Sequence, residues 1–255
     1  WKILKKKNLK YFIIDLSHKN IFKNNPNSEI INIGQFGKII NLIKKKKCKK
    51  VLFAGKIKKP KFSSIKLDLK GIYYIPRIIK ASKLGDAAIL KELIKILDEE
   101  NIKVIKSNFF NPELTLKEGN YTKLKPSLNE MKQIKFGINS LKQTRPHDHI
   151  QALVIRNNKI IAKEASTGTK KMLEAISTTK KNNGGILIKF PKIKQDLRAD
   201  LPTVGLDTLT DSKKCGLRGI VLKSNENIFI NKSKCINFAN KYKMFIKIIW
   251  KKYLS

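Results

Sequence analysis

Short apolar runs that alternate with longer helical segments are the feature that most constrains the fold of this chain. In the first half the runs cover 11–15, 30–33, 50–55 and 102–105, and each has the length of a buried strand. Helical patterns lie between them, over 36–46 and over 86–100, the second with a broad apolar face and Asp86 at the expected N-cap. Because strands separated by helices form parallel sheets covered on both faces, the first half is predicted to be an α/β domain.

The second half shows the same alternation after a stretch rich in Gly, Pro, Asn and Thr at 111–126. We place the domain boundary there, which gives predicted domains over 1–120 and 121–255. The expected elements are helices over 127–142, 169–180, 207–214 and 231–241, and strands over 151–156, 159–164, 185–190, 218–223 and 244–249. Asn157 and Asn158 favour a tight hairpin between the first two strands. The fold class expected is therefore two α/β domains.

The charge of the chain limits its partners. The hydrophobic content of 41% is sufficient for a folded core, and the net charge is +37. Arg occupies five positions, the rest of the 56 basic residues are Lys, and they are spread along the whole chain. Proteins that read nucleic acids usually concentrate Arg and aromatic side chains, so no specific nucleic-acid partner is expected. Attraction to anionic lipid is favoured, since each Lys near such a surface contributes about 1 kcal/mol. A basic nucleic-acid- or ribosome-binding protein is the alternative.

The cysteines and the apolar runs indicate a compartment. Cys48, Cys215 and Cys235 lack the CxxC spacing of zinc and redox motifs, and they fit a reduced protein better than a disulfide framework. No apolar run approaches the roughly 18 residues of a spanning helix, and no signal peptide is visible. We expect a cytoplasmic protein that associates peripherally with a membrane.

The densest group of candidate functional residues follows the apolar run 184–189. It consists of Lys189, Lys192, Gln195, Asp196, Arg198, Asp200 and Thr203. Acids there can hold a divalent metal or aim a water, and cations can offset charge on a phosphoryl group. Asp196 and Asp200 are four residues apart and can share a divalent cation. The alternative is a loop braced by a salt bridge to Arg198.

Glycines mark three other places where an anion could bind. Residues 34–38 join a strand to a helix and could present backbone N–H groups, although a tight turn is the simpler account. Gly55 and Lys56 follow a strand, where open parallel sheets bind ligands; a solvated lysine explains them equally well. Residues 166–169 precede a helix and suit either phosphate binding or capping.

In order along the chain, these pieces resemble the UDP-2,3-diacylglucosamine pyrophosphatases of lipid A biosynthesis, the type found in alphaproteobacteria and unrelated to metallophosphoesterases. The matching segments are 33–39, 53–56, 83–90, 148–151, 168–173, 184–205 and 215–220. The most specific of them is the run QDLRADLPTVG at 195–205. The resemblance covers nearly the entire chain.

The resemblance implies two α/β domains with the substrate in the cleft between them, and a first strand with a Gly-rich loop ahead of residue 1. It implies hydrolysis of UDP-2,3-diacylglucosamine to UMP and 2,3-diacylglucosamine 1-phosphate by metal-assisted attack of water on the α-phosphorus. The implied cofactor is a divalent metal, Mg²⁺ with Mn²⁺ as the alternative. The implied partners are the nucleotide-activated glycolipid and the anionic inner-membrane surface. The oligomeric state, a homodimer included, is left open.

The resemblance also assigns residues. The family's essential aspartate precedes Leu-Pro-Thr, which makes it Asp200, and the catalytic set is completed by Asp196 and Arg198, with the two aspartates as metal ligands. The substrate-binding candidates are Lys189, Lys192, Gln195, Thr203, Gly168, Thr169, Gln151, Gly55, Lys56 and Asp86. The chain departs from its relatives at Ile150, Thr167 and Lys170, where they carry a glycine and two acids. A catalytically weakened member that still binds the nucleotide lipid is therefore a further alternative.

Overall fold

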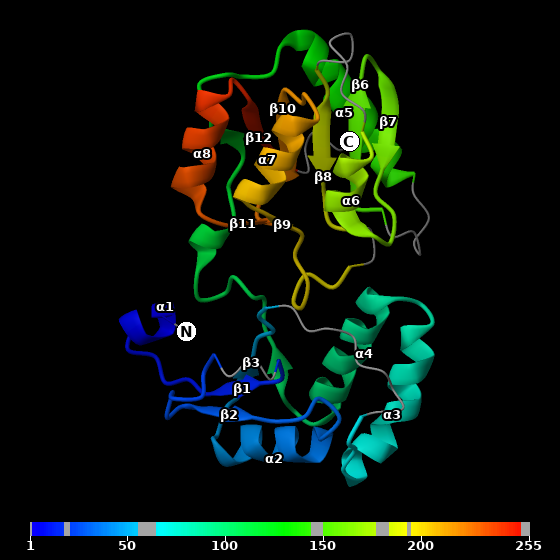
Figure 1. The fold of residues 1–255 in the computed structure, drawn as a ribbon. Helices are drawn as coiled ribbons and strands as arrows, with labels where there is room; N and C mark the ends of the chain where they lie inside the picture. The colour runs from blue at the N-terminus through cyan, green and yellow to red at the C-terminus, as the bar shows by residue number, and fades with distance from the viewer. Residues whose placement is uncertain are drawn as a thin grey trace. The chain divides into compact units, whose positions relative to one another are not determined.

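The computed structural model describes residues 2–17, 21–55, 65–143, 150–176, 184–192 and 195–250 (Figure 1). The chain divides into two compact units. Unit 1 consists of Trp1–Asn111 with Asp196–Asp200, and unit 2 of Pro112–Gln195 with Leu201–Ser255. Both units mix helices and strands, which confirms the predicted fold class. The sequence had assigned everything from 121 onward to the second domain, whereas the short segment Asp196–Asp200 packs with the first unit.

Unit 1 contains helices and two separate pairs of parallel strands in its described part. The helices are α1 (Lys2–Lys6), α2 (Phe36–Lys45), α3 (Leu69–Ser82) and α4 (Asp86–Glu99), and the pairs are β1 (Ile13–Asp15) with β2 (Ser28–Ile30) and β3 (Lys50–Val51) with β4 (Lys103–Val104). Strand β2 ends earlier than predicted because the chain turns, with the N–H of Gln35 bonded to the carbonyl of Asn32 at 3.0 Å.

The sequence missed α3 and misplaced the start of α4. Helix α3 contains Pro76, which usually breaks a helix interior, so no helix was predicted there. The N-cap of α4 is Gly85, with φ of 99°, and Asp86 is the first helical residue. The prediction of Asp86 as N-cap is wrong by one position, because the turn from α3 requires the positive φ that glycine adopts freely.

Unit 2 is built on a six-stranded sheet in the order β5-β12-β10-β8-β6-β7 (Figure 1). The strands are β5 (Gly119–Asn120), β6 (Ala152–Arg156), β7 (Lys159–Lys163), β8 (Ile186–Lys189), β10 (Gly219–Lys223) and β12 (Phe245–Ile249). Strands β8, β10 and β12 are parallel, while β5, β6 and β7 run antiparallel to their neighbours. The predicted β6–β7 hairpin is confirmed, with Asn157 at φ of 52° and Asn158 at φ of 57°.

Helices cover both faces of this sheet. They are α5 (Leu128–Lys142), α6 (Gly168–Glu174), α7 (Leu206–Lys214) and α8 (Lys232–Lys241). Unit 2 also contains a 3₁₀ turn (Pro112–Leu114) and the small parallel pair β9 (Thr203–Val204) and β11 (Ile228–Phe229). On one face α5 packs Ile134 and Ile138 against the sheet. A Cβ at Gly137 would lie 1.9 Å from Cδ1 of Ile155, so only glycine allows this close approach. On the other face, helices α6, α7 and α8 pack against the sheet through Leu173, Leu209 and Ala239.

Charged side chains fix the start of helix α5 in unit 2. Ser127 and Glu130 form a capping box at the start of α5, and Arg218 Nε donates to Glu130 Oε1 at 2.9 Å. Burial raises the pKa of Glu130, but the hydrogen bonds from Ser127 and Arg218 outweigh it and hold the pKa below its ordinary value. This capping fixes the start of α5, the helix that packs Ile134 and Ile138 against the sheet.

None of the described helices is long and apolar enough to cross a membrane.

Candidate active site

The candidate site of unit 2 lies at the carboxyl edge of the parallel strands, where open α/β sheets bind ligands. Lys189 is the last residue of β8, in the middle of the sheet. Because β6 runs antiparallel to β8, Ala152 pairs with Lys189 and Gln151 lies at the same edge. Glu164 follows β7, and its N–H bonds to the carbonyl of Ala152 at 2.9 Å. The topology therefore brings Gln151, Glu164 and Lys189 together from three strands.

A threonine hydroxyl joins the two buried charges at this edge. Lys189 Nζ donates to Thr169 Oγ1 at 2.9 Å, and Thr169 Oγ1 donates to Glu164 Oε1 at 2.9 Å. Gln151 Nε2 approaches the same Oε1 at 3.5 Å. Lys189 is 7% exposed and Glu164 is 4% exposed, and burial of charge is costly unless partners are supplied. The hydroxyl of Thr169 supplies one to each.

The second carboxylate oxygen of Glu164, Oε2, takes no part in this network. Oε2 is buried and has no hydrogen-bond partner among the described residues. An unsatisfied buried acceptor costs about 1–3 kcal/mol, so this oxygen suits a donor that arrives with a bound molecule. Glu164 was not among the residues predicted from the sequence.

Neighbouring loops hold Lys189 in place. Its Nζ donates to the carbonyl of Thr203 at 3.3 Å. The amide of Asn227, which is 2% exposed, donates from Nδ2 to the carbonyl of Lys189 at 3.1 Å and accepts at Oδ1 from the N–H of Lys223 at 2.9 Å. Asn227 thereby ties the ends of β8 and β10 together. The sequence reading missed it as well.

The other predicted residues of unit 2 are placed around this network. Gly168 begins α6 with φ of 87°, and Thr203 begins β9 and is exposed. Gln195 accepts at Oε1 from the N–H of Lys192 at 2.9 Å. Thus Lys189, Thr169 and Gln151 are in one network, while Lys192 and Gln195 bond to each other.

The segment Asp196–Asp200 forms a tight turn within unit 1. Asp196 accepts at Oδ1 from the N–H of Arg198 at 2.9 Å and from its Nε at 3.1 Å, and at Oδ2 from Nη2 at 2.9 Å. These bonds to Arg198 hold the pKa of Asp196 below its ordinary value, against the effect of burial. Arg198 also reaches Asp98 of α4 at 3.5 Å. Ala199 packs on the core of the unit.

This geometry matches the salt-bridged brace that the sequence left open for Asp196. Asp200 is half-buried, and its N–H bonds to the carbonyl of Asp196 at 3.2 Å. Within the described part of the chain, no group of three or more His, Cys, Asp or Glu residues is arranged to hold a metal. Mg²⁺ is often bound by only one or two carboxylates together with substrate phosphates. The carboxylates of Asp200 and Asp196 are donors of that kind, and both oxygens of Asp196 also accept from Arg198.

The remaining candidates of unit 1 lie apart from this turn in the sequence. Gly55 is exposed with φ of 89°, and Lys56 falls outside the described residues. Asp86 is exposed at the start of α4. The anion site considered at 34–38 is filled by the chain itself: Asp68 accepts from the N–H groups of Gly37 at 3.1 Å and Lys38 at 2.9 Å.

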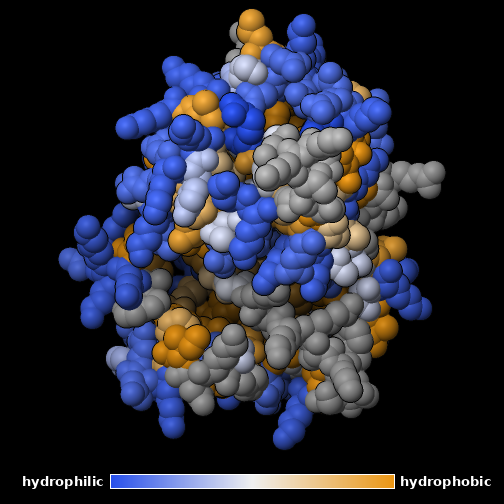
Figure 2. All heavy atoms as spheres, turned by 45° about the horizontal axis from the view of Figure 1, so that its top comes forward, coloured by the Kyte–Doolittle hydropathy of each residue, from blue (hydrophilic) through white to orange (hydrophobic). Residues whose placement is uncertain are grey.

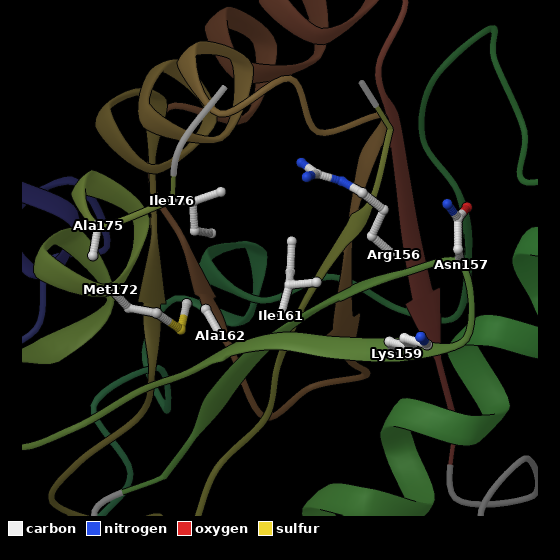
Figure 3. A pocket seen from close by; sticks show the side chains of 8 residues that line it. All are labelled: Arg156, Asn157, Lys159, Ile161, Ala162, Met172, Ala175 and Ile176. Atoms are coloured by element: carbon white, nitrogen blue, oxygen red, sulfur yellow. The ribbon is translucent and has the colours of Figure 1, made fainter. Parts of the chain in front are cut away.

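A separate hollow of about 500 Å³ lies at the other end of the unit 2 sheet, between the β6–β7 hairpin and α6 (Figure 3). Arg156 lies beside it, and its guanidinium donates to the carbonyls of Gly184 at 2.7 Å and Cys215 at 3.3 Å. Ile161 and Met172 line the hollow. None of the predicted site residues lines it, so the candidate site is the carboxyl edge.

Comparison with known proteins assigns both halves of the chain. The model of the LpxI N-terminal domain matches residues 2–114, and the model of the LpxI C-terminal domain matches residues 117–247. The chain is 30% identical over 223 residues to the UDP-2,3-diacylglucosamine pyrophosphatase LpxI of Caulobacter vibrioides, covering 85% of this chain and 80% of that protein. The chain therefore belongs to the LpxI family.

Proposed function

We propose that this protein is a UDP-2,3-diacylglucosamine pyrophosphatase of lipid A biosynthesis. The observation that carries the proposal is the match to the LpxI family over both units, together with the Caulobacter vibrioides relative of that name. The reaction cleaves the pyrophosphate to UMP and 2,3-diacylglucosamine 1-phosphate, with water attacking the α-phosphorus. The nucleic-acid alternative rested on charge alone.

Lys189 is the side chain of unit 2 best placed for the phosphates. It lies at the carboxyl edge of the sheet, and an ammonium there offsets charge that grows on a phosphoryl group during transfer. The hydrogen bond to Thr169 at 2.9 Å orients it. Glu164 positions Thr169 through Oε1. In this proposal Lys189 binds substrate, while Thr169 and Glu164 are positioning residues.

Asp200 is proposed as the residue that orients the attacking water, and Arg198 as the group that fixes the turn carrying it. Asp200 with Asp196 would also hold the divalent cation, Mg²⁺ or Mn²⁺, whose contribution is neutralisation of phosphate charge. Replacement of Asp200 by Asn removes the charge and keeps the size. We expect hydrolysis to fall by at least about a hundredfold with unchanged thermal unfolding. Asp207→Asn, at an exposed acid in the first turn of α7, is the matched control and should keep full activity.

Asp196 can act as brace or as metal ligand, and two variants separate the roles. If it braces the turn, Asp196→Asn and Arg198→Met should lower kcat alike, and the double variant should be no worse than either single one. The apparent affinity for Mg²⁺ should then be the same in Asp196→Asn as in Arg198→Met. A Mg²⁺ affinity lowered only by Asp196→Asn, measured by isothermal titration, would make it a ligand.

The proposed location is the cytoplasm, at the anionic surface of the inner membrane. The substrate carries two acyl chains and so belongs to a lipid leaflet, and the net charge of +37 favours anionic lipid. Hydrophilic residues predominate among those described on the face drawn in Figure 2.

A further inference from the structure

Several large apolar side chains are exposed on one side of helix α3, with Lys80 among them. Leu69 is 87% exposed, Ile72 58%, Tyr73 72% and Leu84, just past the helix end, 61%. Leu69, Ile72 and Tyr73 have the i, i+3, i+4 spacing of one helix face, and Ile79, which is 39% exposed, lies two turns beyond Ile72 on the same side. We call these five residues the α3 outer face. A group of large apolar side chains exposed on one side of a unit marks an interaction site.

The inward side of the same helix is apolar too. Tyr74 and Ile78 are buried in the core of unit 1. The five residues of the α3 outer face stay exposed instead, and among the described residues an apolar partner would be needed to cover them.

Most of the charges around the outer face are positive. Lys66, Lys80 and Lys83 are exposed beside it, Asp86 is an exposed acid near Leu84, and the helix itself contains no acid. The acids packed nearest are held by cations of unit 1: Glu100 accepts from Lys44 and Lys70, and Arg77 bonds to Glu92 and Glu99. The carboxylate of Asp68 is bound to the N–H groups of Gly37, Lys38 and Gly71.

From the apolar face and its basic rim we infer that α3 docks this protein on an anionic lipid surface. Apolar side chains of a surface helix enter the boundary between headgroups and acyl chains, and lysines meet the lipid phosphates. Tyr73 suits the interface because its ring is apolar and its hydroxyl polar. A second copy of the chain fits less well, because it would bring another net charge of +37. The inference rests on the proposed lipid substrate, and it names the surface that reaches the leaflet.

Vesicle flotation tests the inference with the full chain. Vesicles of phosphatidylglycerol and phosphatidylethanolamine are compared at 0.1 and 0.5 M NaCl, because salt screens charge and leaves apolar insertion. We expect wild-type binding to persist at the higher salt, and Leu69→Gln/Ile72→Gln to bind at least about tenfold more weakly there. Leu128→Gln is the matched control, since Leu128 is 86% exposed and also begins a helix; it should bind like wild type. Equal binding by all three proteins would overturn the inference.

A second variant reports insertion directly. Tyr73→Trp adds an indole to the outer face, and its emission, after subtraction of the wild-type signal, should shift to the blue on these vesicles and be quenched by brominated lipid. An unshifted and unquenched emission would contradict insertion. Sedimentation without lipid decides the rival occupant: a wild-type dimer that Leu69→Gln/Ile72→Gln converts to monomer would assign the face to a second copy.

Hydrolysis in detergent micelles separates this inference from the proposed function. There the substrate is presented without a bilayer, so Leu69→Gln/Ile72→Gln should hydrolyse it at the wild-type rate. Intact hydrolysis with unchanged vesicle binding would reject the docking surface alone. Absent hydrolysis in wild type, with vesicle binding that the variant loses, would reject the enzyme and keep the surface.

Discussion

At the scale of single residues, Thr169 connects two charges that the fold buries within one sheet edge. Its hydroxyl accepts from Lys189 and donates to Glu164, both at 2.9 Å. A hydroxyl can do both at once, which no apolar side chain of the same shape can. The orientation of the Lys189 ammonium therefore depends on a residue that need not touch the substrate.

Thr169→Val tests that dependence with a side chain of the same shape. It leaves the charged groups of Lys189 and Glu164 without their shared partner, so we expect unfolding free energy to fall by about 1–3 kcal/mol. We expect kcat/KM to fall between about ten- and a hundredfold as the ammonium loses its orientation. Thr208→Val on α7 is the control. Steady-state kinetics at a temperature where both variants are folded is the measurement; a stability loss with normal kcat and KM would show that Thr169 is structural only.

Sequence reasoning found Lys189, Thr169 and Gln151 but not Glu164 or Asn227. Lys189 stands at the end of an apolar run, which marks it as a strand-end cation. Glu164 is equally close to a strand end, yet only the antiparallel register of β6 with β7 and β8 shows that it faces the same edge. Asn227 is 38 positions from Lys189, and a contact of that range leaves no local signal.

At the scale of elements, one carboxylate serves the start of two helices in unit 1. Asp68 is the N-cap of α3, accepting from Gly71 N–H at 2.8 Å, and it accepts from Gly37 and Lys38 in the first turn of α2. Burial raises its pKa, but these backbone bonds outweigh burial and hold the pKa below the ordinary value of 3.8. The helix termini thus prefer the charged carboxylate.

Asp68→Asn should make the stability of unit 1 less dependent on pH. A lowered folded pKa gives stability that is present above the unfolded pKa and is lost as pH falls through the folded value. The variant should therefore be less stable than wild type by about 1–2 kcal/mol near pH 7, and the difference should shrink below about pH 4. Urea unfolding at both pH values measures it. A difference of equal size at pH 3 and pH 7 would contradict the account.

Elements with local signals were predicted well, and those without were not. The hairpin β6–β7 follows from two asparagines that tolerate positive φ, and α2 begins at Phe36 as expected. Helix α3 was not predicted, because Pro76 lies in its interior.

At the scale of the whole molecule, composition indicates the function poorly, whereas the order of the motifs along the chain indicates it well. The charge of +37 suggested nucleic acid as an alternative, while the family match over 2–114 and 117–247 assigns an enzyme family. The place of Asp196–Asp200 was beyond sequence reasoning. The turn follows a strand of unit 2 in the sequence, but it belongs to unit 1. Ala199 packs on the core of unit 1, and Arg198 forms an ion pair with Asp98 of α4.

The most direct test of the account is hydrolysis of UDP-2,3-diacylglucosamine by the full-length protein in water enriched in oxygen-18. The assay is run with Mg²⁺, with Mn²⁺ and with EDTA, and the products are weighed by mass spectrometry. The account predicts metal-dependent turnover, with the label in UMP because water attacks the α-phosphorus. Label in 2,3-diacylglucosamine 1-phosphate would contradict the direction of attack, and no turnover with either metal would contradict the proposed enzyme.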